Sequence, residues 1–452
     1  MKILVLNGSP KGKNSITLQT VRYIQKKFEQ DQFEILHVGQ QIKKLSDAQE
    51  LQKCMQKMDE SDLVLFCYPV YTFGVPYQLH KLIELLKEHS YQTKAEFATQ
   101  ITTSKHFYDV TAHRFMQENC YDFGFSVMEG LSADMDDLLT PQGRADALAF
   151  FGYVHFCVEK KLATKKNQVK KQLQIYQSSA QETAKIEGGD TVIVTNMTQQ
   201  DVSLRAMVDD FIKIYPYPVR VINIDEFAFA GGCLGCFACA TNGECVYKDG
   251  FDRFLREKIQ TAQCIIFAAA IKDHFFGASF KQYDDRQFCN GHRTVTMGMP
   301  VGYILSGAYS QESNLQMIIE GRCEVGGNFL AGVACDEGED TLQQLQALSD
   351  KTVYALQNKL TLPQNFLGVG GTKIFRDLIY VMRGLMKEDH RFYKKHKIYD
   401  FPQKKIGTIL KMQMVGMLMS IPAGRKKMKT MMGNAIIKPY QKAIDENDKG
   451  GE

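Results

Sequence analysis

The chain has 452 residues, of which 44% are hydrophobic and 23% charged, ordinary values for globular domains. This length predicts two or three domains, each large enough for its own core. The start of the sequence has no basic leader or apolar signal region, and no window approaches the roughly 18 apolar residues of a spanning helix. We therefore expect a cytoplasmic protein, in which twelve cysteines favour metal or redox chemistry over structural disulfides.

Strand and helix patterns alternate through the first 160 residues. Apolar runs predict strands at 3–6, 33–38, 63–66, 97–101 and 123–127. Helical segments follow them near 16–29, 47–58, 76–88, 107–119 and 141–160. Five β/α units of this kind predict an α/β fold, with a parallel sheet between two layers of helices.

The first predicted strand runs into a small polar loop and then a helix that begins near Ser15. Free amides and the positive dipole end of a helix N-terminus bind anions. Further donors and charge around this turn come from Ser9, Lys11, Asn14, Ser15 and Thr17. The loop has neither the dinucleotide glycine pattern nor the nucleotide-hydrolase pattern, so it predicts a cradle for one terminal phosphate. The alternative is an ordinary strand-to-helix turn.

Two more loops are predicted at the same sheet edge, because the carboxyl ends of parallel strands meet there. The third strand is followed by the segment 68–76, YPVYTFGVP, and the fourth by the segment 102–107, TTSKHF. These loops offer aromatic surface and backbone amides for a planar ring, from Pro69, Val70, Tyr71, Phe73, Gly74, Thr103 and Ser104. Core packing is the alternative for each aromatic side chain.

The pattern then repeats after a Lys/Gln-rich linker. Strands are predicted at 191–195, 219–224, 264–268, 301–305 and 329–333, and helices near 199–213, 249–261, 311–320 and 338–358. Asn196-Met197-Thr198 aligns with Asn7-Gly8-Ser9, and the bulky Met197 is expected to close the second cradle. We predict an α/β domain at 1–160, a linker at 161–188, a degenerate second copy at 189–360 and a helical extension at 361–452.

With these motifs the first half resembles the flavodoxin-like NAD(P)H-dependent FMN reductases, on the segments 7–17 and 68–76 and more weakly on 102–107. The resemblance implies a doubly wound five-stranded sheet in the order 2-1-3-4-5 and noncovalently bound FMN. It assigns the phosphate to the loop of Ser9 to Thr17 and the isoalloxazine ring to the loop of Pro69 to Gly74. NAD(P)H would be a transient co-substrate.

Four cysteines lie in the second copy at the spacing C-x₂-C-x₂-C-x₅-C, namely Cys233, Cys236, Cys239 and Cys245. Four thiolates this close can wrap one metal centre, and their tight spacing favours a [4Fe–4S] cluster. Zinc and free thiols stay open as alternatives. The run also resembles the iron–sulfur flavoproteins, a branch of the same family, which implies a cubane cluster. Our hypothesis is a fused pseudo-dimer, in which the cysteines of one copy face the flavin of the other.

The segment 361–452 is basic, with 18 Lys/Arg against 8 Asp/Glu, and contains 9 of the 20 methionines. Lys/Arg clusters lie at 394–397 and 425–429. Three interpretations compete: a helical cap, a peripheral contact with anionic lipid, and a docking surface for a redox partner. We favour the cap, and no motif indicates nucleic-acid binding.

Together these patterns predict an FMN-dependent NAD(P)H oxidoreductase. Electrons would leave the flavin for an iron–sulfur cluster or for a small acceptor such as a quinone, and the chemistry requires no acid/base residues. The alternatives are a flavodoxin-type electron carrier without NAD(P)H turnover and a zinc-bound interaction module without enzymatic activity. The acceptor, small or protein, and the formation of a homodimer are left open by the sequence.

Overall fold

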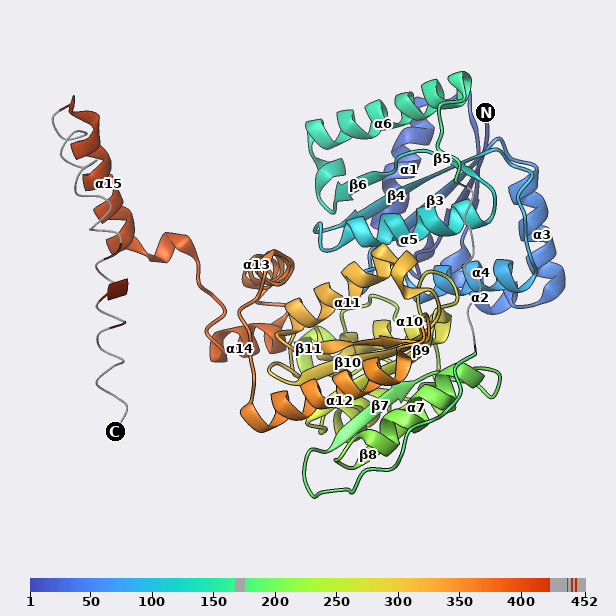
Figure 1. The fold of residues 1–452 in the computed structure, drawn as a ribbon. Helices are drawn as coiled ribbons and strands as arrows, with labels where there is room; N and C mark the ends of the chain where they lie inside the picture. The colour runs from blue at the N-terminus through green and yellow to red at the C-terminus, as the bar shows by residue number, and fades with distance from the viewer. Residues whose placement is uncertain (167–174, 423–436, 438–439, 442–443, 445–452) are drawn as a thin grey trace. The chain divides into compact units, whose positions relative to one another are not determined.

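The structure is a computed structural model of the chain and describes residues 1–166, 175–422, 437, 440, 441 and 444 (Figure 1). The chain divides into two compact units, Met1–Phe392 and Tyr393–Glu452. The first unit contains two parallel sheets, each flanked by helices. No helix within the described ranges has both the length and the apolar character needed to cross a bilayer.

The first sheet has the strand order β2-β1-β3-β4-β5, with β6 also paired to β4. Its strands are β1 (Lys2–Asn7), β2 (Gln32–Leu36), β3 (Leu63–Pro69), β4 (Phe97–Ser104), β5 (Ser126–Val127) and β6 (Leu131–Asp134). Its helices are α1 (Ile16–Lys27), α2 (Val38–Leu45), α3 (Ala48–Asp59), α4 (Tyr77–Glu88), α5 (Asp109–Asp122) and α6 (Pro141–Lys160).

The fifth strand position of this sheet is interrupted, whereas one strand was predicted at 123–127. The short strands β5 and β6 both pair with β4. Between them the Thr99 hydroxyl donates to the Glu129 carbonyl at 2.9 Å, in place of a ladder bond. Gly130 lies so close to β4 that a Cβ atom there would be 2.4 Å from Gln100.

The second sheet repeats the order 2-1-3-4-5, as β8-β7-β9-β10-β11. Its strands are β7 (Thr191–Thr195), β8 (Val219–Asn223), β9 (Cys264–Ala270), β10 (Pro300–Ser306) and β11 (Phe329–Cys335). Its helices are α7 (Val202–Ile214), the short α8 (Cys239–Asn242) and α9 (Phe251–Phe254), α10 (Gly277–Arg286), α11 (Ser313–Gly326) and α12 (Thr341–Asn358). Both sheets are therefore doubly wound and flavodoxin-like, which confirms the predicted fold class.

The two copies share one helical layer (Figure 1). α1 and α6 cover the outer face of the first sheet, and α7 and α12 cover the outer face of the second. Equivalent helices of the two copies meet in the middle, because α4 packs against α10 and α5 against α11. One hydrophobic cluster runs through this layer from Leu82 and Phe115 of the first copy to Phe280 and Leu315 of the second.

The sequence pattern missed α2 and α10. Helix α10 has no apolar pattern from which it could be predicted, because four of its buried residues are charged: Lys281, Asp284, Asp285 and Arg286. Each of these charges is nevertheless at most 2% exposed. Lys281 pairs with Asp285 within the helix, Arg286 with Asp249 at 2.7 Å, and Asp284 with Arg322 at 2.7 Å. Charges in this helix are buried in pairs at the seam between the copies, so the rule that charged residues face water fails there.

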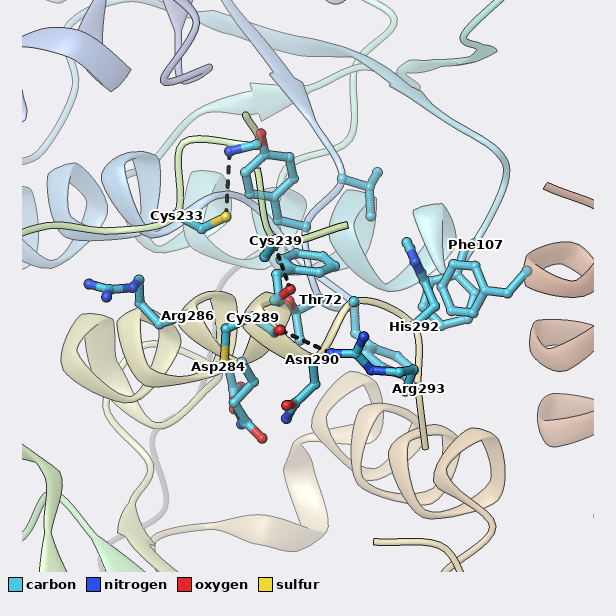
Figure 2. Close-up of a pocket in the computed structure, with 18 of the residues that line it drawn as sticks. Thr72, Phe107, Cys233, Cys239, Asp284, Arg286, Cys289, Asn290, His292 and Arg293 are labelled. Atoms are coloured by element: carbon cyan, nitrogen blue, oxygen red, sulfur yellow. Dashed lines mark hydrogen bonds between the residues drawn. The ribbon is translucent and has the colours of Figure 1, made fainter. Parts of the chain in front are cut away.

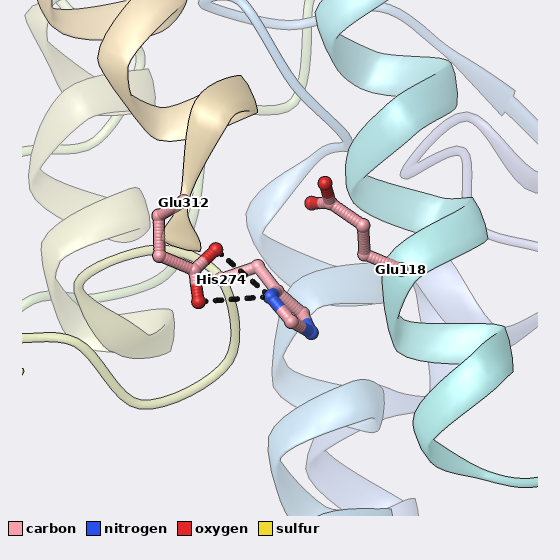
Figure 3. Close-up of side chains that lie close together, drawn as sticks. All are labelled: Glu118, His274 and Glu312. Carbon is pink, nitrogen blue, oxygen red and sulfur yellow. Dashed lines mark hydrogen bonds and ion pairs between the residues drawn. The ribbon is translucent and has the colours of Figure 1, made fainter. Parts of the chain in front are cut away.

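A polar cluster lies at this seam beside the hydrophobic core. His80 of α4 is hydrogen-bonded to Asp273 of the second copy at 2.6 Å. His274 lies between Asp122 of α5, at 3.2 Å, and Glu312, at 2.9 Å. Figure 3 shows its pairing with Glu312. Burial alone would lower the pKa of His274, but its hydrogen bonds to the two carboxylates raise that pKa to about 9. His274 is therefore a buried cation shared by the two copies at neutral pH.

Glu118 of α5 lies next to this histidine (Figure 3). Its buried Oε2 atom has no hydrogen-bond partner among the described residues. Burial raises the pKa of Glu118 to about 7. Ionisation of this carboxyl therefore disfavours the folded chain.

The C-terminal helices are α13 (Phe366–Val381), α14 (Lys387–Lys395) and α15 (Ile406–Ser420). α13 packs against α11 of the second copy. The predicted basic cluster at 425–429, and part of the predicted linker, lie outside the described residues. The predicted domain boundaries therefore stay a prediction.

Both titrations at the seam weaken the fold as the pH rises. A group whose pKa is higher in the folded state than in the unfolded state stabilises the fold at a pH below its unfolded pKa. This stabilisation is lost as the pH rises through the folded pKa. For Glu118 this loss of stability falls between pH 4.5, the ordinary pKa of a glutamate, and about pH 7. For His274 it falls between pH 6.5, the ordinary pKa of a histidine, and about pH 9. Glu118→Gln should raise the unfolding free energy at pH 8 by on the order of 2 kcal/mol, and by less at pH 5.

Urea denaturation across this pH range measures the effect, with the exposed Glu129→Gln as control. The control should follow the parent chain at every pH. A parent curve that is flat between pH 5 and pH 9 would contradict the assignment.

Candidate functional site

The loop after β1 is built as an anion cradle at the start of α1. Ser15 caps the helix by accepting a hydrogen bond from the Leu18 amide, at 3.4 Å. Ser9 is 1% exposed, and its hydroxyl accepts from the Lys11 amide at 3.3 Å. The hydroxyls of Thr17 and Thr103 are 2.6 Å apart, which joins the first turn of α1 to the end of β4. Three predicted loop residues and one from β4 therefore converge at one sheet edge.

The glycines of this loop serve packing. A Cβ atom on Gly8 would lie 2.7 Å from the Leu79 side chain of α4. Gly12 has a φ of +54°, and a Cβ atom there would meet Gln40 of α2. Helix α2, which was not predicted, therefore packs against the loop of the cradle.

The loop after β3 forms a tight turn at the same edge. The Tyr71 amide donates to the Gly74 carbonyl at 2.8 Å, and the Gly74 amide donates back at 2.9 Å. The central residues Thr72 and Phe73 have φ values of 41° and 67°, which are strained for side-chain-bearing residues. The buried Thr72 hydroxyl finds no hydrogen-bond partner in the described part of the chain. A strained turn and an unsatisfied donor beside a cavity are features of a ligand-binding loop.

The second copy holds this turn in place. Lys281 of α10 donates to the Tyr71 carbonyl at 2.9 Å, and Asp285 accepts from the Tyr77 amide at 2.8 Å. Since Lys281 and Asp285 are also paired with each other, one buried ion pair joins the start of the turn to the start of α4. Contacts from the second copy therefore stabilise the strained conformation of Thr72 and Phe73 in the first copy.

These loops enclose a cavity of about 450 Å³ between the two copies (Figure 2). Ten of the twelve residues predicted to bind the coenzyme line it: Ser9, Lys11, Ser15, Thr17, Pro69, Val70, Tyr71, Phe73, Thr103 and Ser104. The remaining two, Asn14 and Gly74, are not in its lining. All four predicted metal ligands line the same cavity. The structure thus brings both predicted sites together.

The cysteine loop of the second copy lies directly against the first copy. A Cβ atom on Gly235 would be 1.9 Å from the Tyr71 hydroxyl, and one on Gly232 would be 2.3 Å from the Tyr77 ring. The Cys233 carbonyl accepts a hydrogen bond from Gln78 at 3.3 Å. Glycines in and beside the cysteine loop therefore allow it to approach the turn of residues 71–74, which we call the ring turn.

Lys11 connects the two motifs electrostatically. Its ammonium lies 5.5 Å from the centre of the Phe237 ring in the cysteine loop. Among the described residues it has no carboxylate within ion-pair distance. An unneutralised lysine at a helix N-terminus favours an anionic ligand.

The four thiols are close to one another without forming a single-ion site. Burial raises the pKa of Cys233 to about 12 and that of Cys239 to about 11, so both are protonated when no metal is bound. A tetrahedral zinc site would place its sulfurs about 3.8 Å apart. Among the described residues, a group of three ligand atoms within 4.8 Å of one another occurs at Glu118, His274 and Glu312, and no three of the cysteines form one. The wider spacing of thiolates around a cubane is compatible with this arrangement.

The sequence analysis missed several residues of the cavity wall. Cys289 is buried at 2% exposure and also lines the cavity (Figure 2). Its neighbour Phe288 accepts a hydrogen bond from Cys239 at 3.0 Å and packs edge-on against Tyr71 at 5.9 Å. Arg293 donates to the Cys289 carbonyl at 3.2 Å. These residues follow the missed helix α10, so no predicted element pointed to them.

In the second copy, the position that corresponds to the cradle is occupied by a carboxylate side chain of the protein itself. The amide and hydroxyl of Thr198 donate to the Asp201 carboxylate, at 2.7 and 2.8 Å. Asp201 stands immediately before α7, where a phosphate would have to approach. A fixed carboxylate repels a phosphate, which adds to the expected obstruction by Met197.

Comparison with known proteins supports the relationship of the first copy. The sequence pattern of the family described as NADPH-dependent FMN reductase matches residues 1–118. No curated protein matches the chain. The family match bears out the resemblance over residues 1–118.

Several solved structures are similar to part of the chain. An NAD(P)H:quinone oxidoreductase from Methanothermobacter marburgensis is 10% identical, with 37% of this chain and 99% of that chain covered and a TM-score of 0.28. An FMN-dependent NADH-azoreductase from Bacillus anthracis, in complex with FMN, is 12% identical, with 36% and 99% covered and a TM-score of 0.25. The apo form of an NADH:FMN oxidoreductase is 17% identical, with 34% and 89% covered and a TM-score of 0.28.

Gly235→Ala should push the cysteine loop away from the ring turn, because the new methyl group would meet the Tyr71 hydroxyl. Gly250→Ala is the matched control, since Gly250 also has a positive φ, of 79°, but a methyl group there would meet no atom within 4 Å. Both variants lose about 1 kcal/mol of stability to the left-handed backbone. Only Gly235→Ala is expected to weaken FMN binding, by about tenfold, in a flavin-fluorescence titration of the apoprotein. Equal affinities for the two variants would refute the contact.

Proposed function

We propose that the chain is an FMN-dependent NAD(P)H oxidoreductase. Electrons would leave for an iron–sulfur cluster on the four cysteines or for a small acceptor such as a quinone. The observation that carries the proposal is the single cavity lined by the α1 cradle, the strained ring turn and the cysteine loop. Bound FMN would supply hydride acceptance from a nicotinamide and onward electron transfer.

The residues present fit this coenzyme. The amides at the start of α1, with Ser9, Ser15 and Thr17, would hold the phosphate, and Lys11 would neutralise part of its charge. The hydroxyl of Thr72 and the amides of Thr72 and Phe73 would face the polar edge of the ring, since the Tyr71 and Gly74 amides are bonded within the turn. Phe73 packs against Phe107 and Tyr108 at 5.1 and 4.2 Å, so its role would be to set the turn.

We infer that the two fused copies act as a pseudo-dimer with one flavin. The packing of α4 on α10 and α5 on α11 supports a two-fold relationship between the copies. The Asp201 carboxylate supports an empty second cradle. One FMN per chain is therefore proposed, bound by the first copy and covered by the second.

We assign the cysteine loop to a metal-bound cluster rather than to free reactive thiols. Reactive cysteines without metal have lowered pKa values, whereas burial raises the pKa of both Cys233 and Cys239. A cluster at this position would share the cavity with the flavin, which supports its assignment as the immediate electron acceptor.

The test of the activity is reconstitution of the apoprotein with FMN, followed by NAD(P)H oxidation with menadione or ferricyanide. Thr17→Val removes one hydroxyl of the cradle, and the FMN concentration for half-maximal activity should rise about tenfold. Thr20→Val is the control, because Thr20 is buried on the same helix but does not line the cavity. NAD(P)H oxidation that is absent from the reconstituted chain would favour the electron carrier instead.

The test of the cluster is iron and sulfide analysis of anaerobically purified protein. The parent chain should contain about four of each per flavin. Cys236→Ser should lose both and keep FMN, because Cys236 is exposed and its replacement does not disturb the core. Cys157→Ala on the distant helix α6 should retain them. One zinc per chain without iron would overturn this part of the proposal.

A further inference from the structure

Helix α15 in the C-terminal unit presents apolar side chains to solvent on all sides. Every residue from Ile406 to Ser420 is exposed except Val415, which is half-buried. The exposed fractions of its large apolar side chains range from 36% to 65%, at Ile406, Ile409, Leu410, Met412, Met414, Met417, Leu418 and Met419. Helices that are apolar all round are normally buried in a protein core or in lipid.

Basic residues surround this helix. Lys404 and Lys405 precede it, Lys411 is the only charged residue within it, and the cluster at 425–429 follows it in the sequence. Between residues 394 and 429 there are ten Lys or Arg against a single acidic residue, Asp400. Apolar side chains with cations at both ends match a bilayer, whose apolar interior is bounded by anionic headgroups.

The length of the helix restricts how it can meet a bilayer. Fifteen residues rise about 22 Å, which is less than the roughly 30 Å of the hydrocarbon core. The helix is therefore too short to cross and long enough to enter one leaflet at a tilt. Lys411, six residues from Lys405, can extend its ammonium back to the headgroups.

We propose that α15 is a monotopic anchor that inserts into one leaflet of an anionic bilayer, with Lys404 and Lys405 at the headgroups. No residue of α15 lines the cavity of the proposed flavin site, so binding to lipid does not rest on the proposed activity. The alternative occupant, a second copy of the chain, offers the same basic charge and would bring like charges together.

The experiment is co-sedimentation of the full-length, FMN-loaded protein with large unilamellar vesicles. Vesicles of 70% phosphatidylcholine and 30% phosphatidylglycerol should pellet the protein, and pure phosphatidylcholine should pellet about tenfold less. Raising the salt concentration from 50 to about 500 mM should narrow that difference, because it screens the headgroup charge.

Leu410→Glu should abolish pelleting, since it places a second charge in the middle of the inserted helix. Leu139→Glu is the matched control, because Leu139 is 77% exposed on the first copy and lies outside the cavity. Lys404→Gln with Lys405→Gln should weaken binding to the anionic vesicles about tenfold and leave FMN content unchanged.

Three results would overturn the anchor. The parent protein could remain in the supernatant with anionic vesicles at 50 mM salt. Leu410→Glu could pellet as well as the parent. Sedimentation velocity could show a dimer that is lost in Leu410→Glu and does not bind vesicles, which would make a second copy the occupant. Loss of NAD(P)H oxidation with intact vesicle binding would instead concern only the proposed activity.

Discussion

The shared hydrophobic layer between the two sheets is the constraint on which the rest of the first unit depends. A flavodoxin-like sheet needs helices on both faces, and here the inner helices of each copy are covered by those of the other. The helices α4, α5, α10 and α11 therefore form an inner layer between the two sheets and not an outer layer facing solvent. Because apolar burial scales with area, this common core fixes the two copies together more firmly than isolated polar contacts could.

The cavity is a consequence of that arrangement. The ring turn of the first copy is strained at Thr72 and Phe73, and the Lys281–Asp285 pair of the second copy binds Tyr71 at its start and Tyr77 at the start of α4. The cysteine loop reaches Tyr71 and Tyr77 only because glycines stand at 232 and 235. A first copy on its own would lack one wall of the cavity and the support for its turn. The duplication therefore divides the work, with one copy providing the cradle and the other providing the cover and the thiols.

Charge is distributed according to the same division. The seam buries ionised groups in partnered clusters, such as His274 between Asp122 and Glu312. The cradle keeps Lys11 available for an anion, whereas the second copy has filled the corresponding place with Asp201. The C-terminal segment combines a large excess of basic residues with a helix whose apolar side chains are exposed. These three regions suit a fixed interface, a phosphate and an anionic surface respectively.

The sequence by itself indicated the strands of both sheets, because buried parallel strands are continuous apolar runs, whereas their order 2-1-3-4-5 came from the family resemblance. It also predicted the polar loop from Ser9 to Thr17 at the start of a helix, since a helix N-terminus needs only adjacent residues. It did not reveal α10, whose buried charges are neutralised by partners such as Asp249 and Arg322, which are distant in the chain. Only the tertiary structure decided that the cysteines and the cradle share one cavity, because that depends on how two separately folded sheets pack, and packing is a non-local property.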